Sequence, residues 1–296
     1  MTLCPLCKCK SDLIYHTKDY NRKISNEIFY YYNCNNCNYI FLKNIPSDLN
    51  SYYKDDYYKI PKSIEQLKKI SNKQQYQINL INKFKSSGKL LEIGPAFGVF
   101  AYLAKMNGFD VETIEMDLAC SNFLNNILKI NTYNTNDPIS LFKTLETYDI
   151  MVLWHVIEHV PDPFNLIKIA STKLNDNGII LIACPNPNSL SLAILKSFWP
   201  HIDAPRHLQL IPLQLLIKNV KSFNLTPVLI TENDKGGRSW NIFTWQKLLM
   251  NTTKKIYLQY FYYILGYLFG FIFSLLEIFT KRGSAYTVIF KKNNDI

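Results

Sequence analysis

From Lys89 onward, short apolar runs alternate with stretches of helical periodicity, and few folds accommodate this order. The apolar runs predict buried strands, and the stretches between them predict helices. Strands that alternate with helices favour a parallel sheet covered on both faces, and two later apolar runs are expected to close that sheet. The predicted strands are residues 90–93, 111–115, 150–154, 178–184, 227–231 and 285–291, and the predicted helices are residues 97–106, 118–128, 164–174 and 213–220.

A glycine-containing turn follows the first predicted strand. Its pattern is Glu92-x-Gly94-x-x-x-Gly98, and a predicted helix begins directly after it. Glycines let the backbone turn sharply and approach a ligand at the carboxyl end of a strand. Glu115 ends the next predicted strand, where a carboxylate can accept hydrogen bonds from both ribose hydroxyls of a nucleoside. The alternative is a strand–helix turn that contains glycine for structural reasons alone.

Four ordered motifs in residues 63–231 resemble class I S-adenosylmethionine-dependent methyltransferases. The chain is similar to the branch of ubiquinone-pathway O-methyltransferases and bacterial sugar-cluster methyltransferases, whose members carry Glu-His-Val after the fourth strand. The resemblance implies an α/β, Rossmann-like fold with a seven-stranded, mostly parallel sheet. It departs from the family at Pro95-Ala96-Phe97, where many members are glycine-rich. The motifs are residues 92–98, Glu115, the strand 148–154 followed by residues 155–163, and residues 174–187.

The resemblance also implies six residues that bind S-adenosylmethionine. Two glycines would leave room for its methionine moiety, and the acidic residue before them would orient the loop or meet the amino group. The acidic residue of the second strand would bind the ribose. Two residues at the end of the fourth strand would line the methionine side. In this order, the residues are Gly94, Gly98, Glu92, Glu115, Trp154 and His155.

Two histidine sites are candidates for catalysis. His159 follows the fourth strand, where a histidine can act as general base for a substrate hydroxyl; the alternative is that it packs against the next helix. His207 and Arg206 belong to a Pro-Arg-His stretch that resembles sugar-cluster members. An arginine beside a histidine suits an acidic or phosphorylated substrate, whereas the alternative is a loop ordered by its prolines.

Two Cys-x2-Cys pairs predict a metal site near the N-terminus. Cys4, Cys7, Cys34 and Cys37 match a tetrahedral structural zinc site, and Cys9 is a spare thiol. The first residues lack the apolar core of a secretory signal, so we expect a cytoplasmic protein whose clustered thiols bind metal. We therefore expect a zinc-ribbon-like module at residues 1–45, a linker at 46–62 and a methyltransferase domain at 63–296. A similar N-terminal zinc module occurs in sugar C-methyltransferases.

Residues 256–276 contain no charge and are long enough for a membrane-spanning helix. They lie between two strands expected in one sheet, and a single crossing would separate those strands. We therefore predict a hydrophobic helical insertion at 240–282 that forms a monotopic or re-entrant hairpin on the cytoplasmic membrane surface. Gly266 and Gly270 would allow a break into two shorter helices. The alternative is a buried or dimer-forming helix pair.

These features predict methyl transfer from S-adenosylmethionine to a small or lipid-linked acceptor. We expect a sugar of bacterial surface-polysaccharide biosynthesis or another hydroxylated, quinol-like metabolite. The alternatives are an RNA methyltransferase that uses the zinc ribbon to bind RNA, and a non-catalytic, membrane-docked adaptor that binds the cofactor. The net charge of +10 suits an anionic partner, but only four of the 33 basic residues are arginine. We do not expect a nucleic acid partner, and the oligomeric state is left open.

Overall fold

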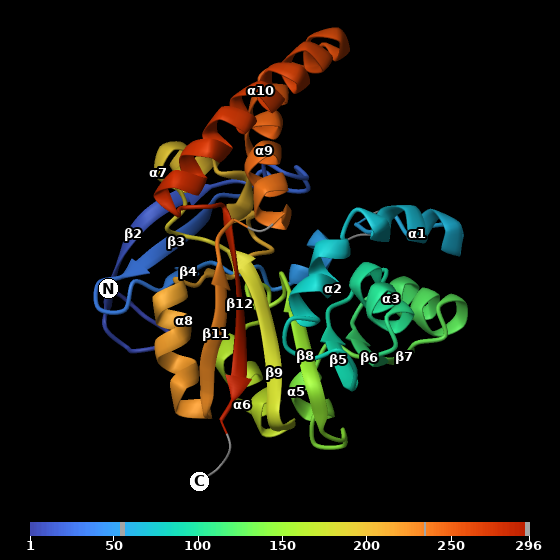
Figure 1. Cartoon of the computed structure of the whole chain (residues 1–296). Coiled ribbons are helices and arrows are strands. Elements are labelled where there is room, and N and C mark those ends of the chain that lie inside the picture. The colour runs from blue at the N-terminus through green and yellow to red at the C-terminus, as the bar shows by residue number, and fades with distance from the viewer. Residues whose placement is uncertain (54–56, 234, 294–296) are drawn as a thin grey trace.

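The computed structural model describes residues 1–53, 57–233 and 235–293. Its larger sheet has seven strands in the order β11-β12-β9-β8-β5-β6-β7 (Figure 1). The strands β5 to β9 are mutually parallel, whereas β12 runs antiparallel to both β9 and β11. The predicted seven-stranded, mostly parallel α/β sheet is therefore confirmed. The strands are β5 (Lys89–Ile93), β6 (Asp110–Glu115), β7 (Asn131–Asn134), β8 (Tyr148–Trp154), β9 (Leu174–Pro185), β11 (Leu225–Thr231) and β12 (Ala285–Lys292).

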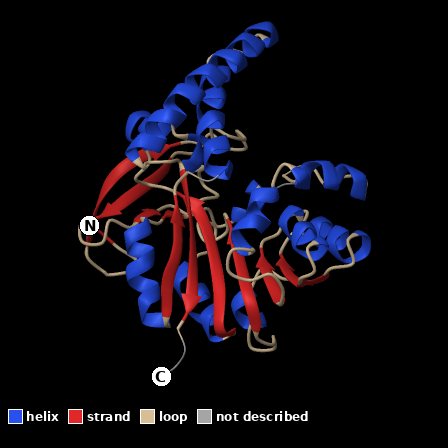
Figure 2. Cartoon of the chain, in the orientation of Figure 1, coloured by secondary structure: helices blue, strands red, loops and turns tan. Residues whose placement is uncertain are grey.

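Helices cover both faces of this sheet, as Figure 2 shows. Side chains alternate along each buried strand, so that Leu90 packs on one face and Leu91 on the other. The first face meets α1 (Ile64–Asn72), α2 (Gln75–Ile81), α3 (Val99–Met106) and the helical segment Phe123–Ile127 that continues α4 (Leu118–Asn122). The second face meets α5 (Pro138–Leu141), α6 (Pro163–Thr172) and α8 (Leu213–Val220). Both cores are thus built from the apolar runs that the sequence shows.

A second, smaller sheet joins the N-terminal module to the rest of the chain. Its order is β1-β2-β3-β4-β10, and Phe41 of β4 pairs with Gln209 of β10. β10 belongs to residues that we assigned to the methyltransferase domain, so the two parts share one sheet. The strands are β1 (Thr2–Leu3), β2 (Lys10–Thr17), β3 (Phe29–Cys34), β4 (Ile40–Leu42) and β10 (Gln209–Leu210).

A helical hairpin lies in the chain between β11 and β12. The short helix α7 (Leu190–Leu195) comes earlier, between β9 and β10. The hairpin consists of α9 (Lys235–Met250) and α10 (Ile256–Thr280), and it projects from the molecule (Figure 1). The expected helical insertion before the last strand is confirmed. The break that we expected at Gly266 and Gly270 is wrong, because α10 is continuous. A Cβ on either glycine would lie within 2.7 Å of an α9 backbone atom, so these glycines permit close helix packing instead.

Candidate active site and cysteine cluster

A cavity of about 820 Å³ opens at the carboxyl end of the parallel strands. Open α/β sheets bind ligands at this edge. The cavity wall comes from six separate segments: the turn after β2, the segment before α1, the end of β5, the end of β8, the loop before β10, and α9. Its lining residues are Asn21, Arg22, Ile24, Tyr57, Tyr58, Gly94, Ala96, Trp154, His155, His159, Pro200, His201, Asp203, His207, Trp240, Phe243 and Lys247.

The turn after β5 brings the backbone close to this cavity. Gly94 has φ +67°, and a Cβ there would lie 2.8 Å from Cγ2 of Val156. Gly98 has φ +82° and begins α3 against the side chain of Leu124. Gly94 lines the cavity, whereas Gly98 does not. Each glycine therefore avoids a collision with a neighbouring side chain, but only Gly94 borders the cavity.

The two predicted acidic residues lie beneath this turn. Glu115 accepts hydrogen bonds from the backbone N–H groups of Ala96 at 2.9 Å and Asp117 at 2.7 Å. Burial raises the pKa of the Glu115 carboxyl to about 7, although these backbone donors oppose the shift. Glu92 is buried in β5, its Oε2 has no hydrogen-bond partner in the described chain, and burial raises its pKa to about 8. Neither carboxylate lines the large cavity, but Glu115 fixes the glycine turn that does.

Aromatic rings form the opposite wall. Trp240 of α9 stacks between His155, at 4.0 Å between ring centroids, and His201, at 4.4 Å. His155 follows β8 with φ +54°, a conformation that non-glycine residues seldom adopt. His201 is buried, and Nε2 of its ring lies 2.8 Å from Oγ1 of Thr244. Three segments far apart in sequence are thus held together by one stack of rings.

His159 and His207 meet in the cavity, with ring centroids 4.6 Å apart. Nδ1 of His159 lies 3.0 Å from the carbonyl oxygen of Arg206, and Nδ1 of His207 lies 2.9 Å from that of His201. A carbonyl oxygen can only accept, so both Nδ1 atoms carry the proton and both Nε2 atoms keep a lone pair. Tyr53 places its hydroxyl 3.0 Å from Nδ1 of His159. Each imidazole is therefore oriented as a potential base.

The charges around His159 favour its neutral form. Burial, and after it the neighbouring His207, lower the pKa of His159 to about 4, although Glu158 opposes the shift. Burial raises the pKa of the Glu158 carboxyl, but its hydrogen bond with His155 and the nearby imidazoles outweigh burial, so the net pKa shift is downward. The site at neutral pH therefore holds an ionised Glu158 carboxylate beside an unprotonated His159.

Arg206 lies behind the cavity wall rather than in it. Its side chain is fully buried, and it donates to Asp203 at 2.9 Å and 2.8 Å and to Asp19 at 2.7 Å. The Arg206 guanidinium, which we expected to bind an acidic substrate, is thus already paired with two carboxylates. This placement corrects the expected role: Arg206 organises the loop that carries His207, whose neighbour it is in sequence.

The cations that face the cavity are Arg22 and Lys247. Arg22 donates to the carbonyl oxygen of Tyr57 at 3.1 Å and lies over the Tyr57 ring. Burial lowers the pKa of Lys247, and the nearby Lys23 and Arg22 lower it further. These cations therefore lie close enough to repel one another, which a bound anion would relieve.

Sequence patterns did not reveal several cavity residues. The tyrosines before α1 form a conspicuous run at residues 52–58, which is a signal that could have been used. Arg22 and Trp240 had no such signal, because only the tertiary fold brings the turn after β2 and helix α9 to the glycine turn. Of the expected site residues, the structure brings Gly94, Trp154, His155, His159 and His207 into one cavity.

The four expected cysteines form a compact cluster in the N-terminal module. Their sulfur atoms all lie within 4.8 Å of one another, and the Sγ atoms of Cys7 and Cys37 are 3.6 Å apart. Both pairs use the same turn: Lys8 N–H donates to the Cys4 carbonyl oxygen, and Asn38 N–H donates to that of Cys34. A tetrahedral zinc site with bonds of about 2.3 Å has sulfur–sulfur edges of about 3.8 Å, so the cluster has suitable dimensions. Cys9 is outside the cluster and accepts a backbone hydrogen bond from Cys4.

The family of methyltransferase domains matches residues 67–230 of the chain. Ubiquinone biosynthesis O-methyltransferase of Colwellia psychrerythraea is 27% identical over 116 residues, which are 37% of this chain and 47% of that protein. The match therefore spans about half the length of that curated relative.

Two solved structures share the fold. A SAM-dependent methyltransferase from Archaeoglobus fulgidus has a TM-score of 0.51 and 20% identity, covering 75% of this chain and 94% of that one. Geranyl diphosphate C-methyltransferase from Streptomyces coelicolor A3(2), determined with Mg2+, geranyl-S-thiolodiphosphate and S-adenosyl-L-homocysteine, has a TM-score of 0.50 and 14% identity, covering 81% of both chains.

Proposed function

The chain belongs to the methyltransferase domain family, and from this premise we propose that it transfers a methyl group from S-adenosylmethionine to a hydroxylated acceptor. The acceptor class that we favour is a small or lipid-linked sugar of the kind used in bacterial surface polysaccharides, or a quinol-like metabolite. The observation that carries this proposal is the pair of neighbouring imidazoles, the neutral His159 and His207, in the same cavity as Gly94.

The residues around the glycine turn fit S-adenosylmethionine. Gly94 leaves space where a Cβ would collide with Val156, and the buried N–H of Trp154 has no hydrogen-bond partner within the described chain. Glu92 offers an unpartnered Oε2 to a cationic amino group, which would favour the ionised carboxylate. Glu115 would hold the ribose. When bound, S-adenosylmethionine supplies a methyl group that is already activated on a sulfonium.

The protein then has to position the acceptor and remove its proton. The lone pair on Nε2 of His159 can take the proton of an acceptor hydroxyl, because its Nδ1 proton is held by the carbonyl oxygen of Arg206. The ionised Glu158 would stabilise the imidazolium that results. Tyr53 and the Arg206 carbonyl fix the ring, so that orientation is set before the acceptor enters.

Cavity charge favours an acceptor with an anionic group. Arg22 and Lys247 both line the cavity and repel one another, so a phosphate or diphosphate would relieve that repulsion. This is the acidic-substrate contact that we had expected from Arg206. A sugar nucleotide and a lipid-linked sugar phosphate share this chemistry.

The cysteine cluster supports a structural zinc ion. Its four thiolates would fill all four positions of a tetrahedral zinc ion. No position would then remain open for a catalytic water or a substrate. We assign the ion the role of fixing the module that carries Asn21 and Arg22 to the cavity.

Methyl transfer is tested with S-adenosylmethionine that carries a tritiated methyl group. The full chain is incubated separately with sugar nucleotides, with catechol-type quinols, with lipid extracted into organic solvent, and with RNA. We expect label in a sugar, quinol or lipid pool, and its loss in His159→Gln but not in His16→Gln, because His16 is exposed on β2. Label in RNA alone would contradict the acceptor class, and failure to bind S-adenosylmethionine in calorimetry would contradict the activity.

A further inference from the structure

The outer face of α10 is an extensive apolar surface. Fourteen large apolar or aromatic side chains of this helix are exposed. If each exposes about half of its roughly 200 Å², their combined area is on the order of 1,000 Å², well above the few hundred that a monomer usually shows. The side chains are Ile256, Tyr257, Tyr260, Phe261, Tyr263, Ile264, Tyr267, Leu268, Phe269, Phe271, Ile272, Leu275, Leu276 and Phe279.

The inner face of the same helix is packed on α9. Gly266 and Gly270 approach the α9 backbone, and Phe273 stacks on Trp245 at 4.1 Å between ring centroids. Only 22% of the most apolar part of α10 is buried, so it is not a core helix. By length and composition it is apolar enough to cross a membrane, at about 37 Å.

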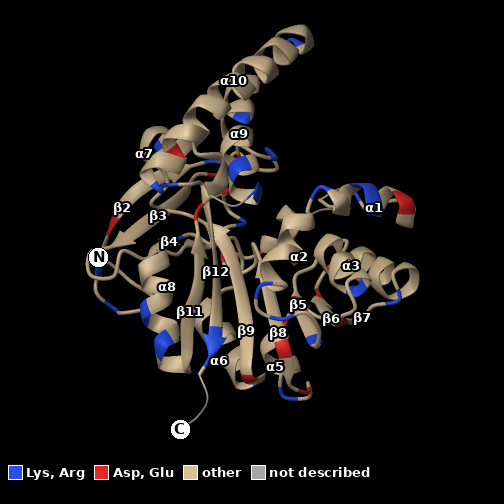
Figure 3. Ribbon diagram, in the orientation of Figure 1, with Lys and Arg blue, Asp and Glu red and all other residues tan. Residues whose placement is uncertain are grey.

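Three features argue for a bilayer as the occupant of this face. Figure 3 shows α10 almost free of charge between its ends. Exposed basic residues stand at each end, Lys254 and Lys255 before the helix and Lys281 and Arg282 after it, where they suit anionic headgroups. The exposed set is rich in tyrosine and phenylalanine, and aromatic side chains of this kind suit the boundary between headgroups and acyl chains.

The hairpin is better suited to lie in the membrane surface than to cross it. Its flanking strands β11 and β12 pair with each other, so both ends of the hairpin are on one side. Tip-first insertion would place Lys254 and Lys255, at the tip of the hairpin, in hydrocarbon, which is unfavourable for charged side chains. An in-plane orientation buries only the outer face of α10.

We propose that the outer face of α10 docks on an anionic bilayer, with the helix lying in the membrane interface. Helix α9 then separates the bilayer from the cavity, since it contacts α10 on one side and contributes Trp240, Phe243 and Lys247 to the cavity on the other. One helix diameter, about 10 Å, lies between them. Resting on the proposed function, this arrangement suits an amphiphilic acceptor whose anionic head reaches Lys247 while its tail stays in the bilayer.

The test is co-sedimentation of the full chain with vesicles. Vesicles of phosphatidylcholine alone are compared with vesicles that also contain phosphatidylglycerol, and we expect at least about tenfold tighter binding to the anionic ones. The triple variant Leu268→Glu/Phe271→Glu/Leu275→Glu should lose binding to both. Its matched control, Ile64→Glu/Met106→Glu/Ile127→Glu, adds the same charge at exposed apolar positions elsewhere and should bind like the unmodified chain.

Two further measurements separate the possible failures. Light scattering after size exclusion reports whether a second copy covers α10 instead. A dimer that forms without lipid and that the α10 variant abolishes would overturn the proposal. The proposal would also fail if the unmodified chain did not sediment with anionic vesicles, or if the control variant also lost binding. Calorimetric S-adenosylmethionine affinity, measured without vesicles, should be equal in both triple variants. Docking without any cofactor affinity would sink the proposed function and leave the membrane proposal standing.

Discussion

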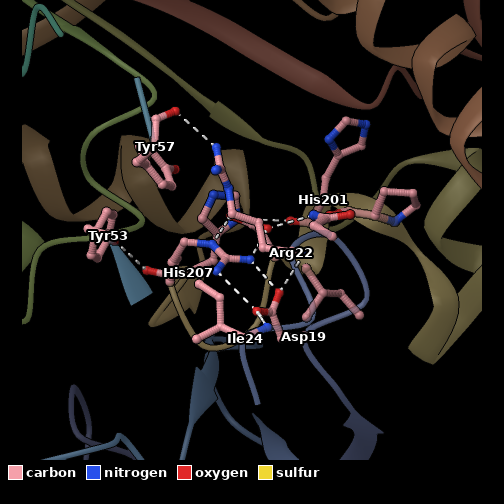
Figure 4. A network of polar contacts seen from close by, with 12 residues as sticks. Asp19, Arg22, Ile24, Tyr53, Tyr57, His201 and His207 are labelled. Carbon is pink, nitrogen blue, oxygen red and sulfur yellow. Dashed lines mark hydrogen bonds and ion pairs between the residues drawn. The ribbon is translucent and has the colours of Figure 1, made fainter. Parts of the chain in front are cut away.

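Arg206 and Asp19 form a buried ion pair, with 2.7 Å between Nη2 of the guanidinium and Oδ1 of the carboxylate. Asp19 also accepts backbone hydrogen bonds from Arg22 and Ile24, which line the cavity (Figure 4). The carbonyl oxygen of Arg206 meanwhile holds Nδ1 of His159. One pair of residues therefore sets the position of the N-terminal module relative to the candidate base.

Replacing Arg206 by methionine should be strongly destabilising. It would leave the carboxylates of Asp19 and Asp203 buried without their cation, so we expect the free energy of unfolding to fall by about 3–5 kcal/mol. Urea unfolding measures this change. Arg238→Met removes an exposed arginine of α9 and should change it by less than about 1 kcal/mol. Equal effects of the two substitutions would refute the structural role of the buried pair.

Gly94→Ala should weaken cofactor binding through a steric contact. Its Cβ would lie 2.8 Å from Cγ2 of Val156, and its φ of +67° adds about 1 kcal/mol of strain. Gly108→Ala is the matched control, because Gly108 also has positive φ, at +89°, but no atom lies within 4 Å of its added Cβ. We expect both variants to lose stability and only Gly94→Ala to lose S-adenosylmethionine affinity in calorimetry. A similar loss in both would assign the effect to backbone strain alone.

Glu115→Gln should lower S-adenosylmethionine affinity by roughly tenfold or more, the loss of one charge-assisted contact. The glutamine keeps an acceptor for one of the two backbone N–H groups that the Glu115 oxygens now bind, so the turn loses one hydrogen bond and the fold should survive. Glu112→Gln on the same strand is the control, because Glu112 contacts Lys89 and Tyr148 instead. Calorimetric titration compares the three proteins. Undiminished affinity in Glu115→Gln would show that the ribose lies elsewhere.

The apolar runs of the sequence predicted six of the seven strands of the larger sheet; β7 was not among them, and the number seven came from the family resemblance. Strands such as β8 are apolar throughout because both faces are buried, and Leu90 and Leu91 serve opposite cores. Helix α9 could not be predicted in the same way. It begins with Gly236 and Gly237 and has no simple apolar stripe, because α10 packs on one side and the cavity lies on the other.

Most of the cavity residues that were predicted follow strands, whereas His207 was predicted from its Pro-Arg-His stretch. His159 and Gly94 come directly after β8 and β5, and parallel strands end at one edge. Arg206 was misplaced because the sequence around it does not reveal that Asp19 lies opposite, 187 residues earlier. Likewise, the stacking of Trp240 on His155 depends on how the hairpin packs.

The pH dependence of methyl transfer should report the environment of His159. Its pKa of about 4, lowered by burial, means that the active, unprotonated form persists well below the pH at which an ordinary histidine charges. With saturating S-adenosylmethionine, so that the carboxyls of Glu92 and Glu115 stay paired with the cofactor, and with an acceptor that does not titrate in this range, kcat/KM for the acceptor should stay level from neutral pH to about 5 and fall near 4. Circular dichroism at each pH excludes acid unfolding as the cause. A fall centred near 6.5 would show that another group is the base.

Zinc content gives the last prediction. We expect about one equivalent per chain, and Cys34→Ser should release it, because the cluster then lacks one of its four thiolates. Cys9→Ser is the matched control: Cys9 lies outside the cluster, so this variant should keep the zinc.

Loss of the ion should unfold residues 1–45 while the larger sheet stays folded, so that limited proteolysis removes the module first. Because that module carries Asn21 and Arg22 to the cavity, acceptor turnover should fall while S-adenosylmethionine affinity is retained. An ordered, zinc-free N-terminus in the unmodified protein would contradict this.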